Sequence, residues 1–337
     1  MARVFITKVT TTLEQHLQDA LTYICWEKYV PNGARVFFKP NLTYPIPKPG
    51  VTTTPEFVEA VLRVFAERTP NLIVGESDGG YQGWPAEVSF QSHKLPEICR
   101  HYGAGLVNLS TEPRTAVRLS LSKGDVILHL PSLLVQDIDV FVTLPVPKIH
   151  QVTMMTGAIK NQWGCIPDNM RLVHHPYFDE MVLEINRLVR TRLALADGTY
   201  FLNRGGPMFG TPVRMDLVLA SDSIGALDTT LCQIMQLDVS CVRYLGVADR
   251  QGWIPPSNKI KYNAAPLSFC VQRFHLDQSL RKRVVRWAFD HPRAITLFWD
   301  SWFADQLHKV LYAITGNVVY DDIRRLQSES HEPIVRQ

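Results

Sequence analysis

The chain has 337 residues, of which 46% are hydrophobic and 20% charged, and its formal net charge at pH 7 is +3. This composition predicts a folded globular protein and argues against extensive disorder. A nucleic-acid-binding protein normally has a concentrated basic surface, so the nearly neutral charge gives no reason to expect a nucleic-acid partner.

Strands and helices are predicted to alternate along the chain. A β-branched strand is expected at 3–9, a helix at 12–29 and a buried strand at 34–42. The next helix, at 52–68, has Thr54 as its expected N-cap and Pro55 at its first helical position. The apolar run LIVGES at 72–77 is typical of a parallel strand that is covered on both faces.

The same alternation continues through the rest of the chain. Further strands are predicted at 105–109, 116–121, 125–130, 139–144, 193–202 and 213–220, and further helices at 92–102, 153–162, 177–191, 223–236 and 278–290. The fold class is therefore α/β, with a mixed, mostly parallel sheet flanked by helices and a helical C-terminal extension. The predicted division is an α/β domain at 1–240 and a mostly helical extension at 241–337 that packs on it.

Several features bear on cellular location and partners. The apolar stretches are shorter than the ~20 residues that span a bilayer, so no integral membrane segment is expected, and the N-terminus is too polar for a secretory signal. The six cysteines include no C-x-x-C pair, so free thiols and a cytoplasmic location are predicted. The aromatic-rich segment 295–316 is expected to pack on its own domain, or alternatively on a membrane surface or a second copy in a homo-oligomer.

Polar residues collect where the predicted strands end. Ligands of open parallel sheets sit beyond the carboxyl ends of the strands, so these residues predict a shared site. The residues are Lys39 and Asn41, Glu76 and Ser77, Lys148 and His150, Asp197, and Asp222.

The stretch PKIHQVTMMTGAIKNQWGC, at 147–165, places cations in apolar surroundings. Lys148 and His150 are two residues apart and point the same way on an extended segment. Lys160 and Asn161 come at the far end of the helix predicted there. Such lysines bind carboxylate or phosphate, or act as bases when they are desolvated.

Several segments together resemble a known family. FKPNLT at 38–43, VGESDGG at 74–80, the P-K-x-H and K-N-x-x-G motifs at 147–164, and LADGTYFLNRGGP at 195–207 are similar to the domain-of-unknown-function family 362, over about 33–240. Some relatives carry a fused ferredoxin-like iron-sulfur module, whose cysteine pattern this chain lacks. The resemblance marks Lys39, Asn41, Thr53, Glu76, Ser77, Lys148, His150, Lys160, Asn161, His175, Asp197, Asp222 and Asp228.

These residues lead to a first hypothesis, an enzyme of the lyase or isomerase type that acts on a small anionic metabolite. Proton abstraction beside a carboxylate needs a base poised near neutral pH and a cation that stabilises the developing enolate. The expected catalytic residues are Lys148, His150, Lys160, Glu76 and Asp197. The expected substrate-binding residues are Lys39, Asn41, Thr53, Ser77, Asn161, His175 and Asp222.

Three alternatives stay open at this stage, and the cofactor, if there is one, is unknown. His150 with His174 or His175 and a carboxylate could bind a metal ion, although the nearby lysines oppose a cation. A redox role is suggested only by the iron-sulfur relatives. A non-catalytic binding protein would disperse the lysines in space.

Overall fold

The computed structural model describes residues 1–81, 83–277, 280–299, 301–302, 304 and 318–330. Within these residues a ten-stranded sheet runs in the order β12-β1-β11-β10-β7-β2-β3-β4, with the hairpin β8–β9 attached to β10, and β5 and β6 form a separate two-stranded sheet. The strands are β1 (Ala2–Lys8), β2 (Val36–Pro40), β3 (Leu72–Glu76), β4 (Gly105–Asn108), β5 (Arg114–Leu121), β6 (Gly124–Pro131), β7 (Val140–Leu144), β8 (Lys148–His150), β9 (Met154–Thr156), β10 (Thr191–Asn203), β11 (Thr211–Ser221) and β12 (Ile260–Tyr262).

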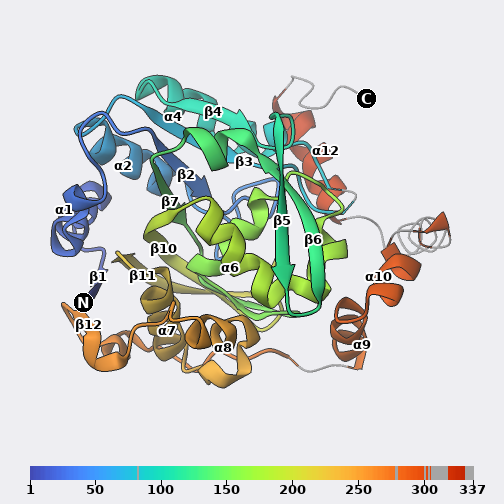
Figure 1. Cartoon of the computed structure of the whole chain (residues 1–337). Coiled ribbons are helices and arrows are strands. Elements are labelled where there is room, and N and C mark those ends of the chain that lie inside the picture. Colours follow the sequence, from blue (N-terminus) through green and yellow to red (C-terminus); the bar gives the residue numbers. More distant parts are fainter. Residues whose placement is uncertain (82, 278–279, 300, 303, 305–317, 331–337) are drawn as a thin grey trace.

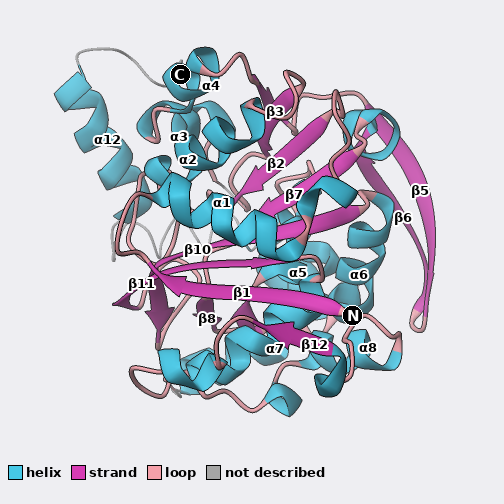
Figure 2. Cartoon of the chain, turned by 90° about the vertical axis from the view of Figure 1, so that its left-hand side faces the viewer, coloured by secondary structure: helices cyan, strands magenta, loops and turns pink. Residues whose placement is uncertain are grey.

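The main sheet is mixed and mostly parallel, as predicted. Strands β10, β7, β2, β3 and β4 pair in parallel, and β1 pairs in parallel with β12. Strand β11 is antiparallel to both of its neighbours, β1 and β10. Figure 2 shows β2, β7 and β10 side by side, with the long β5–β6 hairpin at the right-hand edge, and β11 lies between β10 and β1 in the sheet. The direction of β11 decides which edge of the sheet its last residues reach.

Helices cover both faces of this sheet (Figure 1). They are α1 (Leu13–Ile24), α2 (Pro55–Ala66), α3 (Ala86–Ser92), α4 (Leu95–His101), α5 (Ala158–Asn161), α6 (Phe178–Leu188), α7 (Ile224–Met235), α8 (Arg243–Arg250), α9 (Leu280–Phe289), α10 (Pro292–Trp299) and α12 (Val318–Ser330). Alternate strand residues enter opposite cores, because side chains alternate along a strand. On β2, Val36 and Phe38 pack with α1, α2 and α4, whereas Phe37 joins the cluster with α5, α6, α7 and α8. The fold is therefore a helix–sheet–helix sandwich.

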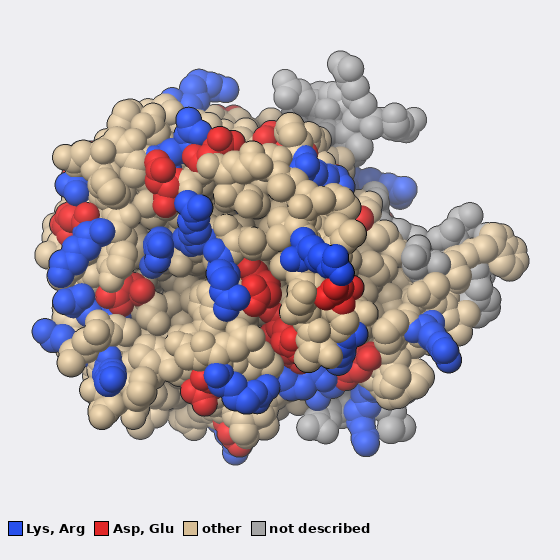
Figure 3. All heavy atoms as spheres, viewed as in Figure 1, with Lys and Arg blue, Asp and Glu red and all other residues tan. Residues whose placement is uncertain are grey.

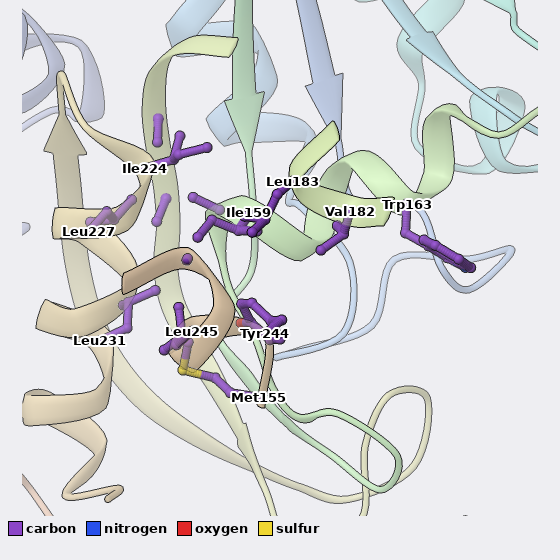
Figure 4. Close-up of a cluster of buried hydrophobic side chains, with 14 of the residues drawn as sticks. Met155, Ile159, Trp163, Val182, Leu183, Ile224, Leu227, Leu231, Tyr244 and Leu245 are labelled. Atoms are coloured by element: carbon purple, nitrogen blue, oxygen red, sulfur yellow. The ribbon is translucent and has the colours of Figure 1, made fainter. Parts of the chain in front are cut away.

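The core that contains Phe37 also contains side chains from the helices that follow the β8–β9 hairpin (Figure 4). Ile159 of α5, Leu183 of α6, Leu227 of α7 and Leu245 of α8 are buried in one cluster. Burying aliphatic side chains of this size contributes about 1.5–3 kcal/mol each. This packing fixes the position of the short helix α5, which carries Lys160.

Local signals explain several element boundaries. Thr54 caps α2 by accepting a hydrogen bond from the backbone N–H of Phe57, and Pro55 starts the helix, as the sequence predicts. The helix predicted at 92–102 is confirmed as α4 (Leu95–His101), and a break separates it from α3 (Ala86–Ser92), which the sequence analysis did not predict. The break falls at Lys94, which has a positive φ of 55° and precedes the Leu-Pro start of α4.

The helix predicted at 153–162 is wrong over its first half. Residues Met154–Thr156 form β9, which pairs with β8, and only Ala158–Asn161 are helical. Met154 has a φ of 68°, a conformation that no α-helix contains. The pairing with β8 therefore overrides the helical spacing of the apolar residues.

The predicted extension, 241–337, contributes α8–α10, α12 and the strand β12, which joins the main sheet beside β1. Helix α12 is attached to the body of the molecule by a hydrogen bond of 2.6 Å from the Tyr44 hydroxyl to Asp322 Oδ2. Of the aromatic segment 295–316, residues 300, 303 and 305–316 lie outside the described residues. The predicted interface between copies through this segment therefore stays a prediction.

Two surface observations bear on the expected partners. On the face shown in Figure 3, Lys and Arg side chains are interspersed with Asp and Glu side chains. Over the described ranges, none of the helices combines the length and the apolar character needed to cross a bilayer.

Candidate functional site

A cavity of about 320 Å³ opens at the carboxyl ends of β2 and β3, beside the β8–β9 hairpin. This is the edge at which ligand sites form in open parallel sheets. Lys39, Lys148 and Lys160 all line it, so chain segments far apart in the sequence converge there. The other predicted site residues in its lining are Asn41, Glu76, Ser77, His150, Asn161 and His175.

Three predicted site residues do not line this cavity. Thr53 links the ends of β2 and β7, because its hydroxyl donates to the Leu144 carbonyl (2.8 Å) and accepts from the Asn41 N–H (2.8 Å). Asp197 accepts hydrogen bonds from the N–H and hydroxyl of Thr54, both 2.7 Å, at the start of α2. Thr53 and Asp197 therefore make contacts that fix the strand ends and the start of α2 next to the cavity.

Asp222 lies at the other edge of the sheet, because β11 runs antiparallel to β10 and its last residues leave at the opposite end. There its carboxylate accepts from the backbone N–H of Arg3 (2.7 Å) and the Tyr29 hydroxyl (3.2 Å). The prediction that Asp222 joins the other polar strand ends is therefore wrong in its geometry. Ser223, the next residue, caps α7 by accepting from the Ala226 N–H.

Lys39 and Glu76 form a buried ion pair at the floor of the cavity. Lys39 Nζ donates to Glu76 Oε2 and to the Pro40 carbonyl (2.9 Å). The Glu76 carboxylate also accepts from the backbone N–H groups of Leu42 (3.2 Å) and Ser77 (3.0 Å). With both oxygens engaged, Glu76 serves as the counter-ion of Lys39 and is poorly placed to accept a proton from a ligand.

Lys148 is fully buried and its ammonium nitrogen contacts neutral groups. Its Nζ donates to Asn41 Oδ1 (3.2 Å) and to the Val51 carbonyl. Burial, and next the positive charges of Lys160 and Lys39, hold the pKa of Lys148 well below its usual range. A neutral amine has two hydrogens and one lone pair, so a deprotonated Lys148 that keeps both bonds has its lone pair free to take a proton.

His150 lies two residues along the same strand, and its tautomer follows from its neighbours. The backbone N–H groups of Val152 (3.1 Å) and Thr153 (3.2 Å) both donate to its Nδ1. Burial, with the nearby Lys160, depresses the pKa of His150 well below 6.5. A neutral ring whose Nδ1 is an acceptor carries its proton on Nε2, so His150 can donate a hydrogen bond from that atom.

Lys160, on α5, has no hydrogen bond or ion pair to any described residue. Its Nζ lies 5.0 Å from the ring centroid of Phe178. Burial, and secondarily the charge of Arg171, lowers the pKa of Lys160 to about 7. Helix α5 is held at its start by Asp228, which accepts from the N–H groups of Ala158 (2.5 Å) and Ile159 (3.1 Å).

Asn161, the neighbouring residue on α5, connects this helix to the ends of β2 and β7 by hydrogen bonds. Its amide nitrogen donates to the Lys39 carbonyl (2.9 Å) and to the Thr143 hydroxyl (3.0 Å). Asn161 thus fixes the distance between α5 and the ends of β2 and β7.

Arg171 is a cavity residue that the sequence reasoning missed. Its guanidinium donates to the Ser77 hydroxyl (2.8 Å), the Ile166 carbonyl (2.6 Å) and the Asp78 carbonyl. The Ser77 hydroxyl in turn donates to the Gly164 carbonyl (2.7 Å). The available signal was the position of Arg171 three residues before the histidine pair, which by itself does not distinguish it from a surface arginine.

Thr156 was also missed. It is 5% exposed and lines the cavity, and its hydroxyl oxygen has no hydrogen-bond partner in the described part of the chain. In the β8–β9 hairpin Thr156 is the direct cross-strand partner of Lys148. Cross-strand partners project from the same face, so Thr156 and Lys148 are neighbours on one face of the hairpin.

Aromatic side chains form the wall next to Lys160. The His175 ring stacks on Phe178 at 5.5 Å and contacts Trp163 at 5.3 Å and Phe289 at 4.7 Å, between ring centroids. Trp163, His175 and Phe289 line the cavity. Phe289 belongs to α9, so the C-terminal extension supplies part of this wall.

The histidines considered as metal ligands are not gathered into a metal-binding set. His174 lies outside the cavity lining, whereas His150 and His175 are within it. Among the residues that the structure describes, no group of three or more His, Cys, Asp or Glu side chains is arranged to hold a metal ion.

The fold and the cavity together define an α/β protein with a cation-lined pocket at the carboxyl ends of its parallel strands. The model of a family described as "Domain of unknown function (DUF362)" matches residues 36–233, which is more than half of the chain. The chain belongs to this family. The family's description assigns no activity.

The chain is also similar to a thylakoid-associated protein, sll1697, of Synechocystis sp. (strain ATCC 27184 / PCC 6803 / Kazusa). The two are 28% identical over 284 residues, which cover 78% of this chain and 84% of that protein. A crystal structure of a protein from Thermotoga maritima matches at a TM-score of 0.38 and 12% identity, over 58% of this chain and 53% of that one.

Proposed function

We propose that this protein is an enzyme that acts on a small anionic metabolite by acid–base chemistry, of the lyase or isomerase type. The observation that carries the proposal is the convergence of Lys148, Lys160 and His150 on one cavity. Burial lowers the pKa of both lysines toward the range in which a side chain exchanges protons near neutral pH.

The hydrogen bonds around each group suggest its role. Lys148 is the base, because its two acceptors occupy two hydrogens and leave a lone pair for the substrate. Lys160 is the cation that binds the substrate anion, because it has no partner among the described residues. His150 donates from Nε2 to the oxygen on which negative charge develops.

In this scheme Lys148 removes a proton from a carbon next to a carboxylate or carbonyl group. The electron pair of the broken C–H bond moves into an enolate, whose oxygen accepts the hydrogen bond from His150. Return of the proton to another position gives an isomerase, and loss of a leaving group gives a lyase. The ion pair of Lys39 and Glu76 adds fixed charge without taking part in the transfer.

We also propose that the protein works in the cytoplasm. The six cysteines are all free in the structure, as expected in a reducing compartment. The relative from Synechocystis is named for its association with thylakoids. Cell fractionation separates the two locations, since a cytoplasmic protein stays in the supernatant at low and at high salt, whereas a peripheral membrane protein is released only by salt.

The proposed chemistry can be tested without knowing the substrate. Purified protein is incubated in D₂O with a panel of small carboxylates and keto acids, and loss of the C–H signal next to the carboxylate is followed by proton NMR. We expect exchange with at least one compound, and we expect Lys148→Met to slow it by about 10²-fold or more.

A matched control is Lys28→Met, which removes an exposed lysine on the 3-10 helix Trp26–Lys28. This variant should exchange protons at the wild-type rate, and circular dichroism should show both variants to be folded. A folded Lys148→Met protein that retains the wild-type rate would rule out the assignment of Lys148 as the base.

A further inference from the structure

The strongest unexplained feature of the cavity is a pair of polar groups that no described residue satisfies. The Thr156 hydroxyl is buried and has no hydrogen-bond partner among the described residues, and the Lys160 ammonium is also without one. Leaving a buried hydroxyl unsatisfied costs about 1–3 kcal/mol, so such groups in a cavity point to a ligand that completes them.

The two groups lie close together along the chain and face the same cavity. Thr156 ends β9, Gly157 follows, and Lys160 is on the next turn, in α5. Gly157 lets the Asp228 carboxylate approach the start of α5, because a Cβ at that position would lie 2.2 Å from Asp228 Oδ1. A carboxylate accepts hydrogen bonds only, so a hydroxyl and an ammonium that line one cavity can both donate to its oxygens.

The surroundings of Lys160 indicate what the carboxylate is attached to. Its Nζ lies over Phe178, which packs against Trp163 at 4.8 Å and stacks on His175. From there the aromatic wall continues to Phe289. A ligand that places its carboxylate on Lys160 therefore has flat apolar rings beside it, which favour a planar apolar group by stacking and edge-to-face contacts.

We propose that Thr156 and Lys160 bind the carboxylate of the substrate and that the substrate carries an aryl or similarly flat apolar group against Trp163, His175 and Phe289. This inference rests on the proposed function and specifies its substrate class as aryl carboxylates. It also assigns Thr156 as a substrate-binding residue. Lys148, the cross-strand partner of Thr156, is then next to the carbon that bears the carboxylate.

The test measures binding, which does not depend on turnover. Isothermal titration calorimetry at pH 6.5 compares phenylacetate, which is flat, with cyclohexylacetate, acetate and inorganic phosphate. We expect phenylacetate to bind about tenfold or more tightly than acetate, because only phenylacetate buries a ring against the aromatic wall. Cyclohexylacetate should bind more weakly than phenylacetate, and phosphate more weakly than either.

Variants then locate the carboxylate. Thr156→Val keeps the side-chain shape and removes the hydroxyl, so we expect it to weaken phenylacetate binding by about three- to tenfold, whereas Thr156→Ser should bind like wild type. Lys160→Met should weaken binding further. The control is Thr7→Val, on β1 and remote from the cavity lining.

Each outcome bears on a separate claim. Equal affinities of wild type and a folded Thr156→Val protein would overturn the role of Thr156, and equal affinities for phenylacetate and acetate would overturn the aryl group. Either result leaves the deuterium-exchange test of the proposed chemistry unaffected. If phenylacetate binds tightly but no compound exchanges its proton for deuterium, the proposed chemistry is wrong and the proposed binding site is supported.

Discussion

Replacing Lys160 by methionine is expected to stabilise the protein at pH 7, although the side chain lies in the proposed site. The reason is that Lys160 keeps an ammonium group in a buried place without a partner in the described residues. Methionine has a similar length and no charge, so it fills the same space and removes the desolvation penalty. The measurement is chemical denaturation at pH 7 and at pH 9, with Lys28→Met as the exposed control.

The size of the effect follows from the pKa. A lysine whose pKa falls from 10.5 to about 7 on folding destabilises the folded state at pH 7 by about 4 kcal/mol relative to a neutral side chain. Loss of the contact with the Phe178 ring offsets about 0.5–1 kcal/mol of this. Water that enters the cavity reduces the penalty further, so we expect a gain of about 2 kcal/mol, against less than about 0.5 kcal/mol for the control.

The sign of the pH dependence provides a second check. Between pH 7 and 10.5 the unfolded chain holds the lysine proton and the folded protein releases it, so wild-type stability rises with pH in this window. Lys160→Met lacks this contribution, and its advantage should shrink by up to about 2 kcal/mol between pH 7 and pH 9. An advantage that is absent at pH 7, or that is the same at both pH values, would refute the reasoning.

Two further predictions concern the charges of the cavity. Binding of a small carboxylate should weaken as the pH rises through about 7, because Lys160 then loses its proton. Calorimetry in buffers of different ionisation heat should show proton uptake on binding near pH 7.5. An affinity that does not change between pH 6 and pH 8.5 would contradict this prediction. Gly164→Ala should destabilise the protein by about 1–3 kcal/mol, because the new Cβ would lie 2.9 Å from both Glu76 Oε1 and Lys39 Nζ. Urea denaturation measures the change in the free energy of unfolding. Unchanged stability would contradict the prediction and show that the Lys39–Glu76 ion pair can move aside.

Much of the fold could be predicted because its signals are local. The run Val36–Pro40 and the run Leu72–Glu76 read as buried strands from their own residues, and Thr54 with Pro55 marks the start of α2. The convergence of Lys39 and Lys148 also follows from local information, since both lie at the ends of predicted parallel strands. A parallel sheet brings such ends to one edge.

The failures share a cause, which is dependence on distant contacts. The direction of β11 is set by its pairing with β1 and β10, and only that direction sends Asp222 to the far edge. Likewise, the strand β9 exists because it pairs with β8, whereas its own residues suit a helix equally well. Arg171 and Thr156 carry no motif of their own, and their position in the cavity becomes visible only when β3, β8 and α5 are assembled.

The proposed binding of an anion would explain the buried lysines of the cavity together. Lys148 and Lys160 each lower the stability of the empty protein near neutral pH, since burial disfavours their charged forms. A carboxylate beside them raises both pKa values and offsets the desolvation penalty, so that binding and folding become coupled. If the two buried lysines had only a structural role, such a ligand would not stabilise the protein. The thermal midpoint at pH 7 should therefore rise in the presence of a saturating aryl carboxylate, and this increase should be lost in Lys160→Met.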